Sequence, residues 1–490
     1  MSAVPDMAAN LRKWPLVTQA SNRSDQFTKD ARLVNAFAER DPNTGEWVVQ
    51  KRIGYENEFS LGAGGGTWGQ YGWASGGGSY YQTGKLYSLY DNGTALVLFA
   101  DGIALGSPFG VAPLAASPLA GWIETQQQVA ANRLLVGATD NTLFHTNGTT
   151  ITVDTAALPA GRGSQIIGPV YLDGTIYISD ELGQIWGSNI DDPTTWQGTN
   201  LIIARSTPGR TTALVKQLTY VIALRESGME VFYDAGNATG SPLSQIAGAT
   251  NDYGCAFNGS PQVIDGILLY VTSNKTVSPQ VIRVDNLVPS VISTPAVEKL
   301  LDAAFSGLGF TYGFSFKHGG HRFYGITSQY INLTLVYDID QQLWYQWTDA
   351  DGNYFRGIAM ASDGTNHFMQ DISSGEVYHF DGDYVFPTDA GVVAPVDIYT
   401  PNMDFGTRRG KTLTRMYINA DQVPGSQIQI SHSDDDYQTW SRPRIRSLAN
   451  KTPYIDDEGT FTKRAYHFRH ARATSFRIRS SDLQMMLGTI

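Results

Sequence analysis

Histidine pairs and acidic runs are the residues of this chain whose types could bind a metal ion. Two His-x-x-His pairs lie at 318–321 and 467–470, and two acidic runs lie at 434–436 and 456–458. Imidazoles are common ligands of transition metals, and carboxylates are common ligands of Ca²⁺. In a strand or turn, however, residues three apart point to opposite faces, and no third ligand accompanies either pair. We therefore predict packed or solvated histidines, solvated acidic turns and no metal site.

The segment SDDDYQTW, Ser433 to Trp440, is similar to the Asp-box S-x-D-x-G-x-T-W of sialidase propellers, with Tyr437 in place of the glycine. An Asp-box stabilises a hairpin, because its aspartate accepts backbone hydrogen bonds and its tryptophan packs in the core. A sialidase also needs an arginine triad, a tyrosine nucleophile helped by a carboxylate, and an acid. No spacing of the arginines indicates such a triad. The motif therefore predicts a turn, and a carbohydrate-binding or sialidase-like propeller is kept as the alternative function.

A phosphate-binding loop is suggested superficially by GGGSYYQTGK, which ends at Lys85. A P-loop has four residues between its glycines and a Ser or Thr after its lysine. Here five residues separate Gly78 from Gly84, and Leu86 follows the lysine. No helical pattern follows that could direct its amide groups at a phosphate. We therefore expect no nucleotide and no other cofactor.

The single cysteine and the N-terminal segment restrict the cellular context. Because Cys255 is the only cysteine, neither an intrachain disulfide nor a thiolate metal cluster can form. The segment MSAVPDMAANLRKWPL lacks the apolar centre of a signal peptide, and no run of eighteen apolar residues occurs. We expect synthesis in a cytoplasm and no membrane span.

Charge is distributed unevenly along the chain. Of the 35 Lys and Arg and 46 Asp and Glu, residues 401–490 contain 14 and 9, so this segment carries +5 and the preceding 400 residues carry −16. Tight binding of nucleic acid relies on clustered Lys and Arg, so the overall acidity argues against it. An acidic surface is compatible with a passage through which DNA slides without binding.

The basic C-terminal segment has a pattern of its own. Between 464 and 479, aromatic and aliphatic residues alternate with Arg and His, which predicts strands with one apolar and one cationic face. Such a face can contact DNA, but it more often belongs to a protein interface or to cross-strand charge pairs. We therefore predict a protein interface in this segment. Its predicted residues are Arg408, Arg409, Arg442, Arg444, Arg446, Arg469 and Arg477.

A glycine-rich stretch, GAGGGTWGQYGWASGGG, spans 62–78. Glycine loses more backbone entropy on ordering than any other residue, so this composition disfavours a helix or the interior of a sheet. We predict a long loop there. Its aromatic residues Trp68, Tyr71 and Trp73 are the candidates for a channel constriction or a docking tip.

Short β-meanders recur between 84 and 384, as in KLYSLYDNGTALVLFADG and HRFYGITSQYINLTLVYDIDQQLWYQW. Their starts lie roughly 40 to 50 residues apart, a spacing typical of propeller blades of about four strands. A sandwich has fewer and less regular strands, and a TIM barrel needs helices between strands. Only TPAVEKLLDAAF, Thr294 to Phe305, has a helical pattern. The sequence predicts an all-β fold with a propeller of five to seven blades.

The length of 490 residues exceeds what one core usually holds, so we divide the chain into three parts. Residues 1–60 are predicted to form an extended N-terminal arm and a hairpin that pack with the C-terminal β-domain. Residues 61–390 are predicted to form the propeller, including the loop at 62–78. Residues 391–490 are predicted to form a sandwich-like β-domain.

Several segments together resemble one protein family. They are RLVNAFAE followed by KRIGYE near the N-terminus, SGMEVFYDAGNATGSPLSQIAGATNDYGCAFNGS and LLYVTSNKTVSPQVIRVDNLVPSVISTPAVEKLL in the middle, LTLVYDIDQQLWYQW, and ISHSDDDYQTWSRPRIRSL with RAYHFRHARATSFRIR at the end. In order and spacing they resemble the tail nozzle or hub proteins of short-tailed bacteriophages, also called packaged-DNA stabilisation proteins. Ile53 stands where that family usually has proline.

The resemblance implies a structural virion protein and not an enzyme. In that family, copies of the chain, six by analogy, form a ring in the tail below the portal and adaptor. The ring retains packaged DNA, lines the exit channel and anchors fibres, spikes or a needle. The implied partners are other copies of the chain, the adaptor and portal, the fibres or needle, and double-stranded DNA in transit without sequence specificity. The implied location is the virion tail, after synthesis in the bacterial cytoplasm.

Overall fold

The structure is a computed structural model. It describes residues 11–18, 30–62, 66–73, 85–92, 95–108, 120–125, 133–138, 141–273, 279–305, 311–362, 366–371, 374–381 and 387–488.

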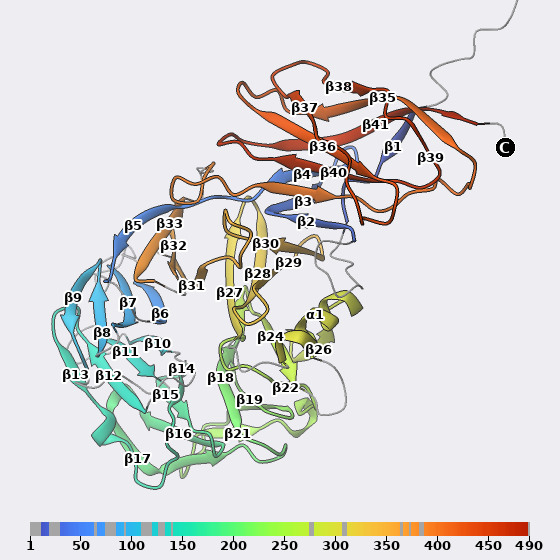
Figure 1. Ribbon diagram of the computed structural model, residues 1–490. Helices are drawn as coiled ribbons and strands as arrows, with labels where there is room; N and C mark the ends of the chain where they lie inside the picture. Colours follow the sequence, from blue (N-terminus) through green and yellow to red (C-terminus); the bar gives the residue numbers. More distant parts are fainter. Residues whose placement is uncertain are drawn as a thin grey trace, which may run out of the picture.

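Antiparallel sheets built from consecutive strands make up most of the chain (Figure 1). The first sheet contains β6 (Gly66–Trp73), β7 (Lys85–Asp91), β8 (Leu96–Ala100) and β9 (Ile103–Gly106). The second sheet contains β10 (Ala120–Thr125), β11 (Arg133–Ala138), β12 (Thr142–Thr146) and β13 (Ile151–Val153). The next two are β14 (Ile167–Leu172), β15 (Thr175–Ser179), β16 (Gln184–Asn189) and β17 (Asp192–Ile203), then β18 (Thr211–Gln217), β19 (Tyr220–Arg225), β20 (Met229–Asp234) and β21 (Leu243–Gln245).

The series continues with a five-stranded sheet and two further sheets. The five strands are β22 (Gly254–Cys255), β23 (Gln262–Ile264), β24 (Ile267–Ser273), β25 (Val281–Asp285) and β26 (Val288–Val291). The remaining strands are β27 (Thr311–His318), β28 (His321–Ser328), β29 (Leu333–Asp338) and β30 (Leu343–Trp347), then β31 (Gly357–Ser362), β32 (Asn366–Asp371) and β33 (Glu376–Asp381). Two short 3-10 helices, Thr155–Ala157 and Ala247–Ala249, lie in the connections.

The first strands of these sheets follow one another around a closed ring. β6 contacts β10, β10 contacts β14, β14 contacts β18, β18 contacts β23, β23 contacts β27, β27 contacts β31, and β31 contacts β6. Apolar clusters fill the space between neighbouring blades, as where Ile185, Leu214 and Phe232 meet. The ring is a β-propeller, which confirms the fold class that the meander spacing predicts.

Two-residue turns connect the first and second strands in several blades. They lie at 173–174, 265–266 and 319–320, and all six of their residues have positive φ. Their sequences are Asp-Gly, Asp-Gly and Gly-Gly, which suit the left-handed backbone of a type I′ hairpin turn. The local sequence therefore sets the register of these hairpins.

The last blade takes its outer strand from the beginning of the chain. β5 (Glu56–Ser60) pairs antiparallel with β33, and the amide of Leu61 donates to the carbonyl of Gly375 at 2.7 Å. The ring is thus closed by backbone hydrogen bonds between residues over 300 positions apart. The predicted boundary between 60 and 61 falls too late, because β5 belongs to the propeller and not to the arm.

The glycine-rich stretch contains a strand where the sequence predicts a loop. Residues 66–73 form β6, which pairs with β7 and has a register shift between Thr67 and Gly69. Glycine loses backbone entropy in a strand, but it is still found there at a bulge and where another backbone approaches closely. β6 meets both conditions, since it lies between the first strands of two neighbouring blades.

A β-sandwich follows the propeller. One sheet contains β3 (Ala36–Arg40), β4 (Trp47–Lys51), β41 (Arg477–Leu487), β35 (Lys411–Ala420) and β38 (Tyr454–Asp456), with β1 (Leu11–Trp14) on β41 and β39 (Thr460–Phe461) on β35. The other contains β2 (Arg32–Val34), β34 (Val396–Tyr399), β40 (Ala465–His470), β36 (Gln427–Ser433) and β37 (Arg444–Ser447). Met416 and Ile478 from the first sheet and Ile430 and Phe468 from the second belong to one apolar core.

The propeller and the sandwich share one continuous sheet in the described part of the chain. β2 pairs in parallel with β30, Val34 opposite Gln346, so β27–β30 and the second sandwich sheet form one nine-stranded sheet. The sandwich therefore lies beyond the propeller rim next to this blade (Figure 1). The apolar core is also continuous across the joint, from Met416 in the sandwich to Phe314 and Trp347 in the blade.

The single predicted helix is confirmed as α1 (Pro295–Phe305). The hydroxyl of Thr294 accepts a hydrogen bond from the amide of Val297 at 3.4 Å, and proline occupies the first helical position. Val297 and Leu301 pack against Val271 and Trp344 of adjacent blades. Within the described ranges, no helix has the length and apolar character needed to span a membrane.

A buried ion pair lies where the N-terminal segment, the propeller and the sandwich meet. Arg52 is 1% exposed, and its two terminal nitrogens donate to the two carboxylate oxygens of Asp389 at 2.9 and 2.5 Å. The guanidinium also donates to the side chain of Asn35 at 2.9 Å and to the carbonyls of Ile53 and Thr348 at 2.8 Å each. All five of its N–H groups thus have acceptors. Burial opposes the charged form, but Asp389 outweighs this effect and raises the pKa of Arg52.

Asn35 extends the same network. Its side-chain amide donates to the hydroxyl of Thr348 at 2.8 Å and to the carbonyl of Pro395 at 2.9 Å, and its side-chain oxygen accepts the amide of Thr348. Its φ of +53° is one that asparagine adopts more readily than most residues. Asn35 therefore connects the end of one blade to the start of the sandwich.

We expect Arg52→Met to destabilise the chain by about 3–5 kcal/mol, because it leaves the Asp389 carboxylate buried without its partner. Guanidinium denaturation followed by tryptophan fluorescence measures this loss. Arg408→Met, at an exposed position, is the matched control and should change stability by at most about 0.5 kcal/mol. The double variant Arg52→Met with Asp389→Leu should recover part of the loss, and a double variant weaker than the single one would contradict the assignment.

Two buried histidines of the nine-stranded sheet make stability depend on pH. Burial, with smaller contributions from nearby cations or histidines, lowers the pKa of His318 and of His470 to about 4. Both folded values lie below the ordinary value near 6.5, so the unfolded chain binds more protons between pH 4 and 6.5. Stability should therefore fall as the pH decreases through this window, by on the order of 2–3 kcal/mol for each histidine. Burial also opposes protonation of His321, but Asp338, 2.7 Å away, raises the pKa of His321, which acts in the opposite direction.

Comparison of the wild-type chain with His470→Gln at pH 7 and pH 4.5 tests this assignment. We expect the variant to be less stable at pH 7 but to lose less stability on acidification, since glutamine does not titrate. Parallel pH profiles of the two unfolding midpoints would contradict it. His432→Gln, which removes a histidine paired to Glu458 at 2.8 Å, controls for the loss of any imidazole.

Candidate functional site

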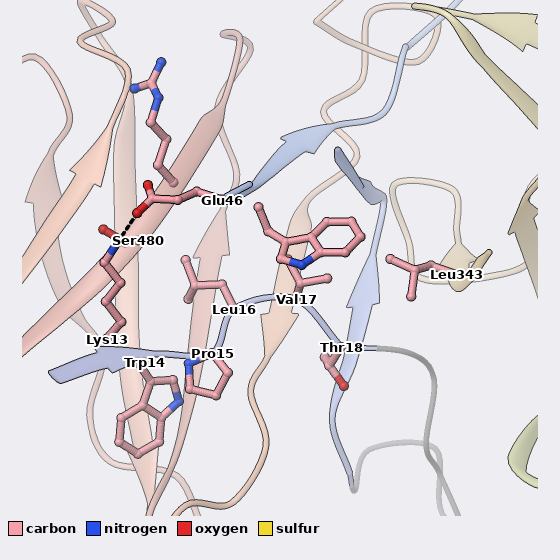
Figure 2. Close-up of a pocket in the computed structure, with 11 residues that line it drawn as sticks. Lys13, Trp14, Pro15, Leu16, Val17, Thr18, Glu46, Leu343 and Ser480 are labelled. Carbon is pink, nitrogen blue, oxygen red and sulfur yellow. Dashed lines mark hydrogen bonds and ion pairs between the residues drawn. The ribbon is translucent and has the colours of Figure 1, made fainter. Parts of the chain in front are cut away.

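A pocket of about 510 Å³ lies at the joint between the sandwich and the propeller (Figure 2). Its volume falls within the range of small-ligand and side-chain binding pockets. Figure 2 shows Leu343 on one side, facing the residues of the N-terminal segment. The lining residues are Lys13, Trp14, Pro15, Leu16, Val17, Thr18, Glu46, Trp47, Leu343, Arg479 and Ser480.

Packing and two ion pairs position this lining. Trp14 is 2% exposed and lies edge-on to Tyr466, with ring centroids 4.8 Å apart. Lys13 is paired with Glu46, and a hydrogen bond from that carboxylate raises the pKa of Lys13. Arg479 is paired with Asp421 at 2.7 Å. The rim charges are therefore matched within the chain, and the inner wall is aromatic and aliphatic.

The lining residues are mainly apolar. Glu46 is the only acid among the 11 residues drawn, and it is paired with Lys13. This pocket could not be predicted from local sequence patterns, because its walls come from segments that are distant along the chain.

Two of the predicted interface arginines hold the sandwich together. The guanidinium of Arg444 pairs with Glu458 at 2.9 Å and donates to the carbonyl of Asp456 at 2.5 Å. Arg446 donates to the carbonyl of Tyr454 at 2.6 Å. Both side chains start from the edge strand β37 and reach the segment around β38 in the opposite sheet. They close the open side of the sandwich.

Two more predicted arginines have contacts within the chain. Arg469 pairs with Asp397 at 3.1 Å, and the same carboxylate lies 2.7 Å from the ring of His467. Arg477 donates to the side-chain oxygen of Gln50 at 3.2 Å. These are cross-strand pairs between β34 and β40 and between β4 and β41.

The other three predicted arginines are exposed. Arg408, Arg409 and Arg442 have no side-chain hydrogen bond or ion pair with any residue in the described part of the chain. Four of the seven predicted arginines are thus engaged within the chain, and the role of the seven at a protein interface stays a prediction. The structure leaves three of them available to a partner.

The aromatic candidates of the glycine-rich stretch are only partly described. The backbone of β6 carries Trp68, Tyr71 and Trp73, but their side chains lie outside the described structure. Their proposed role at a channel constriction or tip stays a prediction.

The first histidine pair is arranged differently from the expectation that its members point apart, whereas His467 and His470 lie on opposite faces of β40 as expected. The turn at 319–320 makes His318 and His321 direct register partners across the hairpin. His321 bonds Asp338, and His470 lies 3.0 Å from the hydroxyl of Ser426. Among the described residues, no group of three or more His, Cys, Asp or Glu is placed to hold a metal ion.

The Asp-box-like segment forms a tight turn. The carboxylate of Asp435 accepts hydrogen bonds from the amide of Thr439 at 2.9 Å and the hydroxyl of Ser433 at 2.8 Å. The bonds from Thr439 are the largest of the effects that lower the pKa of Asp435 to about 2. Tyr437, at the glycine position of the motif, has a φ of +64°. This geometry agrees with the structural interpretation of the motif.

The lone thiol is also unsuited to chemistry. Cys255 is fully buried, and burial raises the pKa of its thiol to about 12. A nucleophilic or metal-binding cysteine needs the thiolate form. Cys255 is therefore a packing residue between two blades.

Comparison with known proteins identifies one family. A family model described as "Bacteriophage P22 Gp10, beta-propeller" matches residues 110–385. No curated protein matches the chain.

Solved structures give weaker likenesses. The computationally designed Ika8 protein has a TM-score of 0.38 and 12% identity, covering 72% of this chain and 100% of that chain. BamB from Moraxella catarrhalis has a TM-score of 0.38 and 10% identity, covering 76% and 98%. The N-terminal domain of Nup159 has a TM-score of 0.35 and 9% identity, covering 66% and 97%.

Arg442 and Arg444, two residues apart, should respond differently to charge reversal. Arg444→Glu removes the partner of Glu458, whose side chain is 3% exposed, and adds a like charge beside it. We expect a loss of at least about 2 kcal/mol. Arg442→Glu should stay within about 0.5 kcal/mol of wild type. Thermal unfolding midpoints measure both variants. Equal losses of stability would contradict the assignment of Arg444 as the residue that closes the side of the sandwich.

Proposed function

The chain belongs to the family of the bacteriophage P22 Gp10 β-propeller, the tail nozzle and packaged-DNA stabilisation proteins of short-tailed phages, and on this premise we propose that its copies form a closed ring in the tail. Family membership makes the chain a structural protein of the virion. The proposed ring lies below the portal and adaptor, has six copies, retains packaged DNA and lines its exit. Fibres, spikes or a needle attach to the same assembly.

The observation that carries the proposal is the fusion of propeller and sandwich into one body. A ring that holds pressurised DNA needs subunits that do not bend between their attachment points. The nine-stranded sheet and the fully bonded Arg52 remove the usual hinge between two domains. Two separate domains joined by a linker would be expected to move relative to each other.

The net negative charge also supports a channel that lets DNA pass without binding it. The first 400 residues carry a net charge of −16, which repels phosphates and disfavours binding. The pocket at the joint offers an apolar docking site and lacks the paired groups of an enzyme active site. A structural role therefore accounts for both features better than catalysis does.

We expect the purified chain to join portal–adaptor complexes as a ring whose added mass is about six times the 53.5 kDa of one chain. Light scattering of the chain alone, of the complex and of their mixture measures this directly. A fixed added mass indicates a closed ring, because contacts between two different surfaces would otherwise continue into an open filament. Bovine serum albumin added in equal amount is the control for nonspecific association.

A chain that stays monomeric and does not join the complex would contradict the proposal. A glycan screen by thermal shift would then test the alternative, a carbohydrate-binding propeller. A midpoint raised by a sugar favours that alternative, whereas the nozzle role predicts no shift.

A further inference from the structure

One end of the sandwich presents two arginines without an ion pair among the described residues, beside two exposed apolar side chains. The loop at 404–410 meets the end of β41, where the amide of Gly488 donates to the carbonyl of Gly410 at 2.8 Å. Met486 is 56% exposed and Leu487 is 59% exposed. We name Arg408, Arg409, Met486 and Leu487 the basic tip.

A buried lysine fixes the shape of the tip. The ammonium of Lys411 donates to the carbonyls of Thr407 at 2.7 Å, Arg409 at 3.0 Å and Thr462 at 2.7 Å. All three of its protons are used, and the side chain is buried, which lowers the pKa of Lys411. The loop is therefore held from inside while Arg408 and Arg409 face solvent. A surface arranged in this way before binding loses less entropy when a partner docks.

The opposite chemistry occurs on the blade β14–β17. Its turns at 173–174 and 190–191 touch, since the amide of Asp191 donates to the carbonyl of Gly174 at 2.9 Å. Tyr171 and Ile190 are 37% and 71% exposed. We name Tyr171, Asp173, Ile190 and Asp191 the acidic corner.

The carboxylates of the corner are exposed and lie on tight turns. Asp173 and Asp191 are exposed, and neither has an ion pair with another residue in the ranges that the structure covers. Their φ values of +46° and +56° belong to tight turns, which limit backbone motion. The corner and the tip thus each combine two exposed apolar side chains with two exposed charges, of opposite sign. One opposite charge lies beside each group, since Lys216 is 5.5 Å from the Tyr171 ring and Asp404 is exposed in the tip loop.

The two surfaces cannot meet within one molecule. Figure 1 places the end of β41 and the blade β14–β17 at opposite ends of the chain. A contact between them must join two copies head to tail. Head-to-tail contacts repeat from copy to copy and close into a ring when the rotation permits.

We propose that the basic tip of one copy docks on the acidic corner of the next, and that this contact joins neighbouring subunits. The inference rests on the proposed ring and names its partner, a second copy of this chain. Arg408 and Arg409 face Asp173 and Asp191, and Met486 and Leu487 pack on Tyr171 and Ile190. The contact weakens as salt rises, because exposed charges are screened beyond a Debye length of about 8 Å at physiological ionic strength.

Two charge-reversed chains test the contact. Arg408→Glu with Arg409→Glu reverses the tip, and Asp173→Lys with Asp191→Lys reverses the corner. Each variant alone puts like charges against each other, so we expect ring formation on portal–adaptor complexes to weaken by about tenfold or more. Mixed in equal amounts, the two variants can alternate around a ring with every contact attractive, and assembly should return. The readout is the added mass by light scattering at 0.15 M salt.

The controls separate docking from folding. Lys451→Glu reverses an exposed charge away from the tip and should assemble as wild type does. Asp173→Asn with Asp191→Asn keeps residues that tolerate positive φ, so it should fold normally while assembling more weakly. Thermal midpoints of all variants show whether the turns remain intact.

The outcomes distinguish this inference from the function on which it rests. Wild-type chains that form no ring overturn the proposed function itself. If the wild-type chain forms rings and the reversal variants assemble to the same added mass, only the tip–corner contact is overturned. A tip variant that fails both alone and in the mixture, while the corner variant assembles, also overturns it and assigns the tip to the adaptor.

Discussion

The buried charge of Arg52 is the constraint on which the joint between the two parts depends. An ionised group removed from water is strongly unfavourable unless its hydrogen-bonding groups are all satisfied and a counter-charge is present. Arg52 meets both conditions only because acceptors arrive from three separate places: the N-terminal segment, the end of the blade β27–β30 through Thr348, and the start of the sandwich through Asp389. None of these places can move alone without leaving a buried polar group unpaired. The joint is therefore stable only when all three segments are in place together.

The sheet and the core reinforce this closure on either side of the ion pair. β2 continues the blade into the sandwich by backbone hydrogen bonds, and Phe314 and Ile430 belong to the same apolar cluster although they lie in different parts of the fold. Burial of this surface favours the joined arrangement without directing its geometry. The directional groups, Arg52 and Asn35, select one geometry from the many that apolar contact alone would permit.

Sequence reasoning found the parts of the fold that local interactions determine. The hairpins of the blades and the helix α1 follow from residues close together in the chain. β5 and the Arg52–Asp389 pair were missed, because a strand or an ion does not show in its own sequence which distant segment it will meet. The strand β6 was missed because glycine composition was judged without its bulge and its close neighbours. The arginines were grouped by charge, whereas burial of Glu458 decides that Arg444 is a clamp and Arg442 is free.

The closure of the last blade by β5 has a consequence for synthesis on the ribosome. β5 emerges early, but its partner β33 begins at Glu376, more than 300 residues later. At the usual 5–20 residues per second the strand waits roughly 15–60 seconds without its partner. An unpaired apolar strand would be prone to aggregate during that time. The sequence of β5 is ENEFS, with Glu56, Asn57 and Glu58 exposed even in the finished fold, so the waiting strand is polar and carries repelling charges. The propeller is thus closed only after β33 has been made, by a strand whose polar and charged residues oppose aggregation while it is unpaired.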